Sequence, residues 1–329
     1  MKTLINSCLG SILAILLSAC ENKKTEPNLA MIDPLPSWND GALKRSIINY
    51  VNKASDSSSA GFVPAESRIA TFDNDGTLWA EKPLVQELFA YYMVKRMIAQ
   101  KPSLKTKQPF KAVLGNDKTY FKKGGEKALL ELINATHTGM TEDAFEAAVH
   151  DFFATAVYPR HHEPLIEITY QPQLELLALL RDHGFKTYIC SGGTIELIRG
   201  ISEQFYHVPR EQVIGSIFKY QFIDSNRAVM RLPGVALLND KGGKPVSIQM
   251  HIGRRPVFAC GNEGGAGDLA MLLYSQGNKF PSFQLLINHD DANREYAYQE
   301  KDSLSLKTAS KNNWHVASMQ KDWNQVFHK

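Results

Sequence analysis

Two aspartates in the stretch ATFDNDGTLW, residues 70–79, are the side chains best suited to chemistry in this sequence. The apolar and β-branched residues before Asp73 predict a β-strand that ends in acid. Because side chains alternate along an extended segment, Asp73 and Asp75 can point the same way while Asn74 points away. Gly76 then permits a sharp turn. Carboxylates at the carboxyl end of a strand lie where open α/β sheets bind ligands, although an acidic turn is the plain alternative.

A second polar turn, Ser-Gly-Gly-Thr, follows a predicted helix at 172–183 and a predicted apolar strand at 185–190. The hydroxyl group of Ser191 and the backbone amides of Gly192 and Gly193 would form an anion site at the start of the next helix. As a nucleophile, Ser191 would need a paired histidine base, which no nearby residue supplies. A serine that only caps the helix is the simpler alternative.

Two more polar segments follow in order. The segment NDKGGKP, residues 239–245, places Lys244 before Pro245, which we expect to be the first residue of a helix. A predicted strand at 257–260 then ends in GNEGGAGD, residues 261–268. A lysine in a glycine-rich loop is usually solvated. Lys244 is a candidate site residue only because its segment follows the other polar segments in order.

Taken together, the four segments resemble the four motifs of the haloacid dehalogenase superfamily, in order and at the ends of apolar strands between residues 70 and 268. The nearest resemblance is to its phosphoserine-phosphatase-like and acid-phosphatase-like members, some of which carry Asp-Asn-Asp-Gly-Thr-Leu-Trp. It implies an α/β fold, a doubly wound parallel sheet with a Rossmann-like core and an inserted helical cap.

The resemblance also implies a reaction: Mg²⁺-dependent hydrolysis of a small phosphorylated metabolite. Asp73 would attack phosphorus to form an aspartyl phosphate, and Asp75 would act as general acid and then as base. We therefore expect the pKa of Asp75 to lie above that of Asp73. Members that remove halide lack an acid at the position of Asp75, which favours phosphate esters. The phosphate would be bound by Ser191, Gly192, Gly193 and Lys244, with Lys241 as an alternative to Lys244.

Mg²⁺ prefers oxygen ligands in an octahedral arrangement. The resemblance implies that Asp73 and the backbone carbonyl of Asp75 supply them, together with Asn262 or Asp268. The sequence departs from the family here, since many members have aspartate in place of Asn262 and the loop is two residues longer. Glu263 is therefore an alternative ligand.

Two other functions stay open at this stage. A phosphotransferase or mutase would use the same aspartates but would need a cap that excludes water, and an assay for free phosphate distinguishes it. A lipoprotein that binds a phosphorylated ligand without catalysis is favoured only by the neutral Asn262.

The pattern of apolar residues predicts the domain organisation. We expect the core at 38–79 and 166–329, and the cap at 80–165. Helices are predicted at 42–53, 83–100, 126–135, 141–157, 172–183, 195–205 and 269–274. Further strands are predicted at 212–217, 283–287 and 314–319, with a β-hairpin at 218–232.

Two polar clusters remain ambiguous. The segment 158–164 is predicted to be a surface loop. The alternative is that Arg160 in this segment contacts the substrate phosphate. The acidic end of the strand at 283–287, from His289 to Asp291, would either line the pocket or cap a following helix.

The N-terminus resembles a bacterial lipoprotein signal. Residues 1–19 contain one charge and an apolar run too short for a comfortable membrane span. The resemblance makes Cys20 the lipidated residue, and residues 20–37 a flexible tether. The expected location is the cell envelope, facing the periplasm, with Glu21 favouring the outer membrane. A plain secretory signal or an uncleaved anchor is the alternative.

Charge and cysteine content limit the partners. The net charge falls from +3 to +2 without residues 1–19, and no basic run with interleaved aromatics occurs. Nucleic acid is therefore not an expected partner, and no protein partner is indicated. Cys190 and Cys260 end the strands predicted on either side of the Asp73 strand, about 10 Å apart. We expect both to be buried free thiols because a disulfide cannot span that distance.

Overall fold

The computed structural model describes residues 33–264 and 267–328. All described helices and strands belong to a single unit, Pro34–Lys329. The predicted signal peptide and Cys20 lie outside the described residues, as does most of the predicted tether. None of the described helices is both long and apolar enough to cross a membrane.

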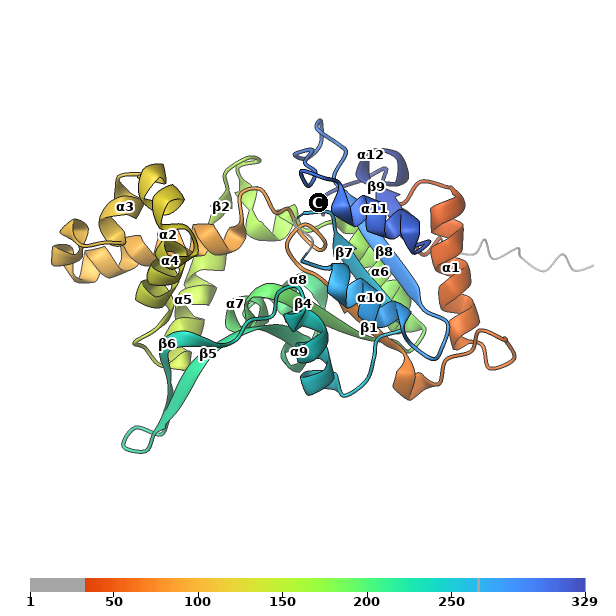
Figure 1. The fold of residues 1–329 in the computed structure, drawn as a ribbon, viewed down its shortest axis with the longest axis horizontal. Helices are drawn as coiled ribbons and strands as arrows, with labels where there is room; N and C mark the ends of the chain where they lie inside the picture. The colour runs from red at the N-terminus through yellow and green to blue at the C-terminus, as the bar shows by residue number, and fades with distance from the viewer. Residues whose placement is uncertain (1–32, 265–266, 329) are drawn as a thin grey trace, which may run out of the picture. The chain divides into compact units, whose positions relative to one another are not determined.

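A seven-stranded sheet forms the centre of the fold, in the order β6-β5-β4-β1-β7-β8-β9 (Figure 1). All neighbouring strands are parallel except β5 and β6, which form an antiparallel hairpin. This arrangement confirms the predicted α/β fold. The strands are β1 Ile69–Phe72, β4 Lys186–Thr194, β5 Val213–Ile223, β6 Ala228–Leu237, β7 Phe258–Asn262, β8 Phe283–Asn288 and β9 His315–Ser318.

Strand β1 lies between β4 and β7, as predicted. Every residue of β1 is buried, which fits an apolar strand covered on both faces. In the register of the sheet, Phe72 is paired with Ile189 of β4 and with Cys260 of β7. The residues beyond this pairing, which are Asp73 after β1, Cys190–Thr194 at the end of β4 and Gly261–Asn262 at the end of β7, therefore meet at one edge of the sheet.

Helices cover both faces of the sheet, and alternate residues of one strand pack on opposite sides. In β8, Leu285 and Ile287 join a core with α1 and α6, whereas Leu286 joins a second core with α9, α10 and α11. This alternation is what a doubly wound sheet requires. The helices are α1 Ala42–Ser55, α6 Gln171–Asp182, α9 Gly243–Ile252, α10 Leu269–Gln276, α11 Leu304–Lys311 and α12 Met319–Asp322.

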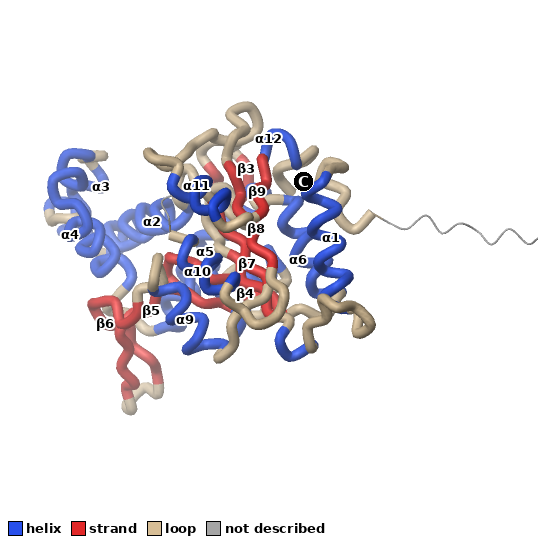
Figure 2. The backbone as a smooth tube through the Cα atoms, turned by 45° about the vertical axis from the view of Figure 1, so that its right-hand side comes forward, coloured by secondary structure: helices blue, strands red, loops and turns tan. Residues whose placement is uncertain are grey.

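Four helices lie in the chain between β1 and α6, and most of them gather to one side of the sheet (Figure 2). They are α2 Val85–Gln100, α3 Phe110–Leu114, α4 Lys118–His137 and α5 Glu142–Thr155. The predicted N-cap of α5 is confirmed, since Thr141 Oγ1 accepts a hydrogen bond from Ala144 N at 3.2 Å. A small apolar core holds α2, α3 and α4 together, made of Ala90, Val94, Ile98, Phe110 and Leu132. The short strands β2 Val157–Tyr158 and β3 Glu163–Pro164 lead back to the core.

Some predicted elements are wrong in detail. The helix predicted at 195–205 is two short helices, α7 Ile195–Arg199 and α8 Ser202–Tyr206. Gly200 lies at the break, where an added Cβ would approach Val149 of α5 to 2.5 Å. The predicted strand 212–217 and the first arm of the hairpin form one strand, β5. Helix α9 begins at Gly243, two residues before Pro245.

The helix predicted at 126–135 extends to α4, which is interrupted by a kink at Gly125. Cys190 and Cys260 are free and buried, which confirms the prediction of two structural thiols.

Candidate active site

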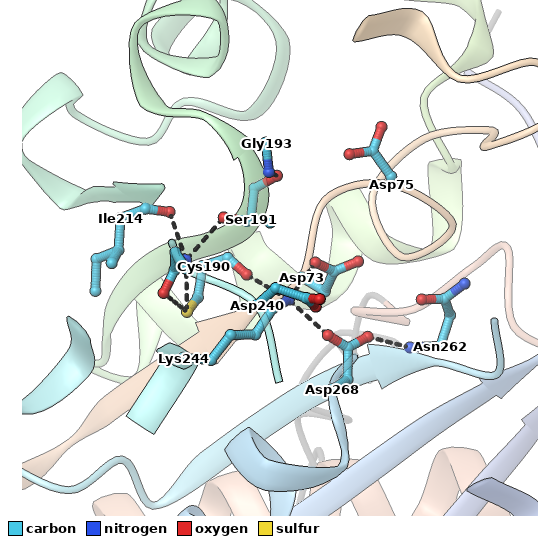
Figure 3. Close-up of polar contacts among 12 residues, drawn as sticks. Asp73, Asp75, Cys190, Ser191, Gly193, Ile214, Asp240, Lys244, Asn262 and Asp268 are labelled. Atoms are coloured by element: carbon cyan, nitrogen blue, oxygen red, sulfur yellow. Dashed lines mark hydrogen bonds and ion pairs between the residues drawn. The ribbon is translucent and has the colours of Figure 1, made fainter. Parts of the chain in front are cut away.

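A cavity of about 610 Å³ opens where β1, β4 and β7 end. Its lining brings together residues from all four predicted motif segments and from the helical insertion. From the predicted site, the lining includes Asp73, Asp75, Gly192, Gly193, Lys244, Asn262 and Asp268. Figure 3 shows Asp73, Lys244 and Asp268 as one cluster, with the carboxylate of Asp75 apart from it.

Lys244 is at the centre of this cluster. Its Nζ donates to Oδ1 of Asp73 and to Oδ1 of Asp268, each at 2.5 Å, and to the carbonyl oxygen of Cys190 at 2.8 Å. The side chain of Lys244 is 2% exposed, whereas Lys241 is exposed to solvent. Of the two lysines considered from the sequence, the structure thus places Lys244 beside Asp73.

The cluster contains two carboxylates for one ammonium group. Burial raises the pKa of Asp73 well above its usual range and the nearby Asp268 raises it further, against the opposing effect of Lys244. Burial alone would lower the pKa of Lys244, but Asp268 and Asp73 raise it overall, so this side chain stays charged. The cluster therefore carries excess negative charge when both acids are ionised.

Burial also raises the pKa of Asp75, although Trp79 and Gln86 oppose the shift by hydrogen bonding. The expectation that the pKa of Asp75 lies above that of Asp73 is therefore wrong, because burial raises both and raises that of Asp73 well above its usual range. The physical reason is that Asp73 is desolvated and faces a second carboxylate, Asp268.

The oxygen donors of the cluster fit a divalent cation. Asp73 and Asp268 supply carboxylates whose excess negative charge a cation would balance, and Asn262 adds an amide. Figure 3 shows the oxygen of Asn262 on the side of the cluster, because its Nδ2 lies 3.3 Å from both Glu81 Oε2 and the hydroxyl of Tyr298.

Within the described chain, no three His, Cys, Asp or Glu side chains form a metal-binding group, so a metal here would need the amide and backbone oxygens. Glu263 is turned elsewhere, since its Oε1 accepts from the backbone N of Glu300 at 2.9 Å. Residues Asp73, Asp75, Asn262 and Asp268 thus stay the predicted ligands.

Gly76 allows Asn262 to approach the turn after β1. Its φ of 77° lies in the left-handed region. A Cβ at this position would lie 2.1 Å from Nδ2 of Asn262. The carbonyl oxygen of Gly76 also pairs with Nε2 of the buried His289 at 2.8 Å. His289 thus supports the turn from behind.

Asp291 and Arg160, whose roles the sequence left open, lie outside the cavity lining. Asp291 forms an ion pair with Arg294 and accepts hydrogen bonds from the backbone, and no described helix follows it directly. Arg160 stacks 3.7 Å from the ring centroid of Tyr296 and donates to the carbonyl oxygen of Glu295. The hypothesis that Arg160 contacts the substrate is therefore wrong for this conformation.

Ser191 is placed differently from its neighbours. It is fully buried, and its Oγ accepts a hydrogen bond from the backbone N of Gly193 at 3.1 Å. Gly192 and Gly193 line the cavity, but Ser191 is not part of the lining. Asn239, which sequence reasoning missed, donates from Nδ2 to the carbonyl oxygen of Ser191 at 2.7 Å. This contact ties the second motif segment to the loop that carries Lys244.

Gln86, near the start of α2, is the second residue that sequence reasoning missed. Its Nε2 donates to Oδ2 of Asp75 at 3.0 Å, and its Oε1 accepts from the backbone N of Thr194 at 3.1 Å. Trp79 Nε1 holds the other carboxylate oxygen of Asp75 at 2.9 Å. Gly193 makes room for Gln86, because a Cβ there would lie 1.7 Å from Nε2. A polar residue at a helix start carries no sequence signal for this bridge.

We expect the substitution Gln86→Ala to lower kcat by about 10-fold. The reason is that Asp75 loses one of its two side-chain donors and the insertion loses a link to β4. Steady-state kinetics and the melting temperature measure the two effects separately. Gln100→Ala, at the exposed end of the same helix, is the matched control. Equal kinetics for the two variants would contradict a positioning role for Gln86.

Comparisons with known proteins agree with this fold. Residues 70–272 match the sequence model of the haloacid dehalogenase-like hydrolases. The chain is similar to a protein of unknown function from Anaerococcus prevotii DSM 20548, with a TM-score of 0.56 and 14% identity over 88% of this chain and 94% of the other. At that identity, the likeness concerns the fold alone.

Two further solved structures are less similar. One is a phosphoserine phosphohydrolase-like protein from Francisella tularensis subsp. tularensis SCHU S4, with a TM-score of 0.41 and 16% identity over 78% of this chain and 95% of that chain. The other is a phosphoserine phosphatase in its apo form, with a TM-score of 0.34 and 13% identity over 67% and 86% of the two chains. No curated protein sequence matches the chain.

Proposed function

Because the chain belongs to the haloacid dehalogenase-like hydrolase family, we propose that it hydrolyses small phosphomonoesters through an aspartyl phosphate on Asp73. The observation that supports this most directly is the contact of Asp73 with the buried ammonium group of Lys244, at 2.5 Å, beside a cavity that also exposes Asp75. A carboxylate nucleophile, a fixed cation and a second acid are the groups that phosphoryl transfer in two steps requires.

In the first step, a carboxylate oxygen of Asp73 bonds to phosphorus and the bond from phosphorus to the ester oxygen breaks. The leaving alkoxide takes the proton of Asp75. The raised pKa of Asp75 supports this role, since burial favours its protonated form. In the second step, Asp75 accepts a proton from water as the water oxygen attacks phosphorus, which releases phosphate and restores Asp73. Lys244 and the backbone amide of Gly192 would stabilise the phosphoryl oxygens, since the amide of Gly193 donates to Ser191 Oγ.

Asp73, the backbone carbonyl of Asp75, Asn262 and Asp268 would hold Mg²⁺ in this proposal. When bound, the metal would neutralise charge on the phosphoryl oxygens. The excess negative charge around Lys244 supports a cation at this position. Asp268 Oδ2 also accepts from the backbone N of Asn262 at 3.0 Å, which ties the carboxylate of Asp268 to the start of this loop.

The substitution Asp75→Asn tests the acid and base role. We expect turnover of an alkyl phosphate to fall by about 10²–10⁴-fold. The first step with 4-nitrophenyl phosphate should fall far less, because nitrophenolate leaves without a proton. Rapid-mixing absorbance should then show a burst of one nitrophenolate per chain, followed by slow turnover. Equal losses for both substrates without a burst would contradict the assignment of Asp75.

We also propose that Cys20 carries a lipid that holds the enzyme at the bacterial cell envelope. In bacterial cells grown with radioactive palmitate, the full chain should be labelled and should sediment with membranes. Cys20→Ser should lose the label and move to the soluble fraction, whereas Cys8→Ser, within the predicted signal, should keep both properties. A labelled Cys20→Ser protein would overturn this proposal.

A further inference from the structure

The walls of the active-site cavity differ in character. The end formed by the sheet is polar and carries the Asp73–Lys244–Asp268 cluster. The opposite wall, formed by α2, α4 and the residue before α2, is apolar among its described residues except for Gln86, Glu87 and His137. Its apolar side chains are Leu84, Ala90, Tyr91, Phe121, Leu129, Leu132 and Ile133.

The apolar wall offers room for more than a phosphoryl group. A volume of about 610 Å³ lies in the range of sites that enclose whole small molecules. Leu84 and Leu129 are 41% and 51% exposed although they line the cavity, so a ligand would cover apolar surface that the protein leaves open to water. Covering that surface with an apolar group is favourable, whereas a polar group would gain nothing from it.

The charges around the cavity argue against an anionic leaving group. Among the described lining residues, Lys244 is the only permanent cation, and Asp73 and Asp268 already bind it. Glu81 and Glu87 add negative charge to the lining. A substrate carboxylate would therefore enter without a partner, which is costly for a buried charge.

His137 and Arg231, at the end of the cavity away from Asp73, add no positive charge to its lining. His137 lines the cavity, but burial and then Arg231 lower its pKa to about 3, so it is neutral. Arg231 lies behind it, where Nε donates to the carbonyl oxygen of His137 at 2.6 Å. Its guanidinium group pairs with Glu142 and Glu196 and is outside the lining.

We propose that the phosphomonoester bound by this site has an apolar, uncharged alcohol as its leaving group, of arylalkyl or branched-alkyl type. This inference rests on the proposed phosphatase function and adds the substrate class to it. The alcohol packs against the wall from α2 and α4 while the phosphoryl group faces Asp73.

The first test compares primary alkyl phosphates, so that leaving-group chemistry is matched. Initial rates of phosphate release by the full chain, purified in detergent with Mg²⁺, are measured for 2-phenylethyl phosphate, O-phospho-L-serine and O-phosphoethanolamine. We expect kcat/KM for 2-phenylethyl phosphate to be at least about 10-fold higher than for either of the other two. Equal values, or a preference for a charged substrate, would overturn the substrate class and leave the phosphatase function intact.

Adjacent leucines on α4 provide a matched pair of variants. Leu129 lines the cavity, whereas Leu130, which is 39% exposed, does not. Leu129→Lys should lower kcat/KM for 2-phenylethyl phosphate by at least about 10-fold and raise that for O-phospho-L-serine. Leu130→Lys should leave both values within about 2-fold. Identical behaviour of the two variants would contradict the proposed role of this wall.

A binding experiment separates the inference from the proposed function. Titration calorimetry with 3-phenylpropylphosphonate and with 2-amino-4-phosphonobutyrate, which are not hydrolysed, needs no turnover. Tighter binding of the phenyl compound by at least about 10-fold would support the apolar site, even in a chain that releases no phosphate. Equal or reversed affinities would overturn it. Absence of phosphate release from every ester, with the phenyl compound still preferred, would refute the hydrolase function alone.

Discussion

Asp73→Asn is expected to lower kcat for phosphate release by at least about 10⁴-fold, because the amide cannot displace the alcohol. Folding should survive, since the substitution removes one of two carboxylates that share a single ammonium group. The melting temperature should therefore be unchanged or higher. Asp302→Asn, the same change at an exposed site, is the control and should match the unsubstituted chain in both measurements. Full turnover by Asp73→Asn would refute the nucleophile assignment.

Lys244→Met is expected to affect both stability and catalysis. It leaves Asp73 and Asp268 buried without their cation, which costs about 3–5 kcal/mol of unfolding free energy. It also removes a fixed charge beside the nucleophile, so kcat should fall by about 10²–10³-fold. Urea unfolding and steady-state kinetics measure the two effects. Lys241→Met, in the same loop but exposed, should change neither.

A double variant separates the two consequences of losing Lys244. Combining Lys244→Met with Asp268→Asn removes a carboxylate together with its cation, so part of the lost stability should return. Activity should not return, because neither group remains beside Asp73. If the double variant recovered activity, the cation would have only a structural role.

The sheet and its polar edge could be predicted because the sequence signal is local. An apolar run that ends in acid predicts β1 and Asp73, and the order of the later strands follows from the family resemblance. The same reasoning predicted Lys244 over Lys241 as the cation near the nucleophile. Each of these site residues takes its position from the strand or helix that carries it, and the apolar pattern predicts those elements well.

The contacts of the insertion could not be predicted in the same way. Gln86 meets Asp75 and Thr194 only because α2 approaches the end of β1, and no periodicity encodes that approach. Gly193 and Gly200 are glycines for the same reason, since neighbouring side chains fill the space that a Cβ would take. Tertiary packing also turned Ser191 away from the cavity.

The charge balance of the cluster could be predicted only in part. The sequence separates Asp73, Lys244 and Asp268 by long stretches of chain, and only the fold brings both carboxylates to one ammonium group. Burial and then Asp268 raise the pKa of Asp73 against the opposing effect of Lys244, which the expected order of aspartate pKa values had not anticipated.

Identification of the phosphorylated residue tests the central claim most directly. The full chain is mixed with a ³²P-labelled phosphomonoester and Mg²⁺, quenched in acid within milliseconds, digested and analysed by mass spectrometry. We expect an acyl phosphate on Asp73, sensitive to hydroxylamine and absent from the Asp73→Asn variant. Label on Ser191, or steady phosphate release that continues in Asp73→Asn without any labelled aspartate, would contradict the account.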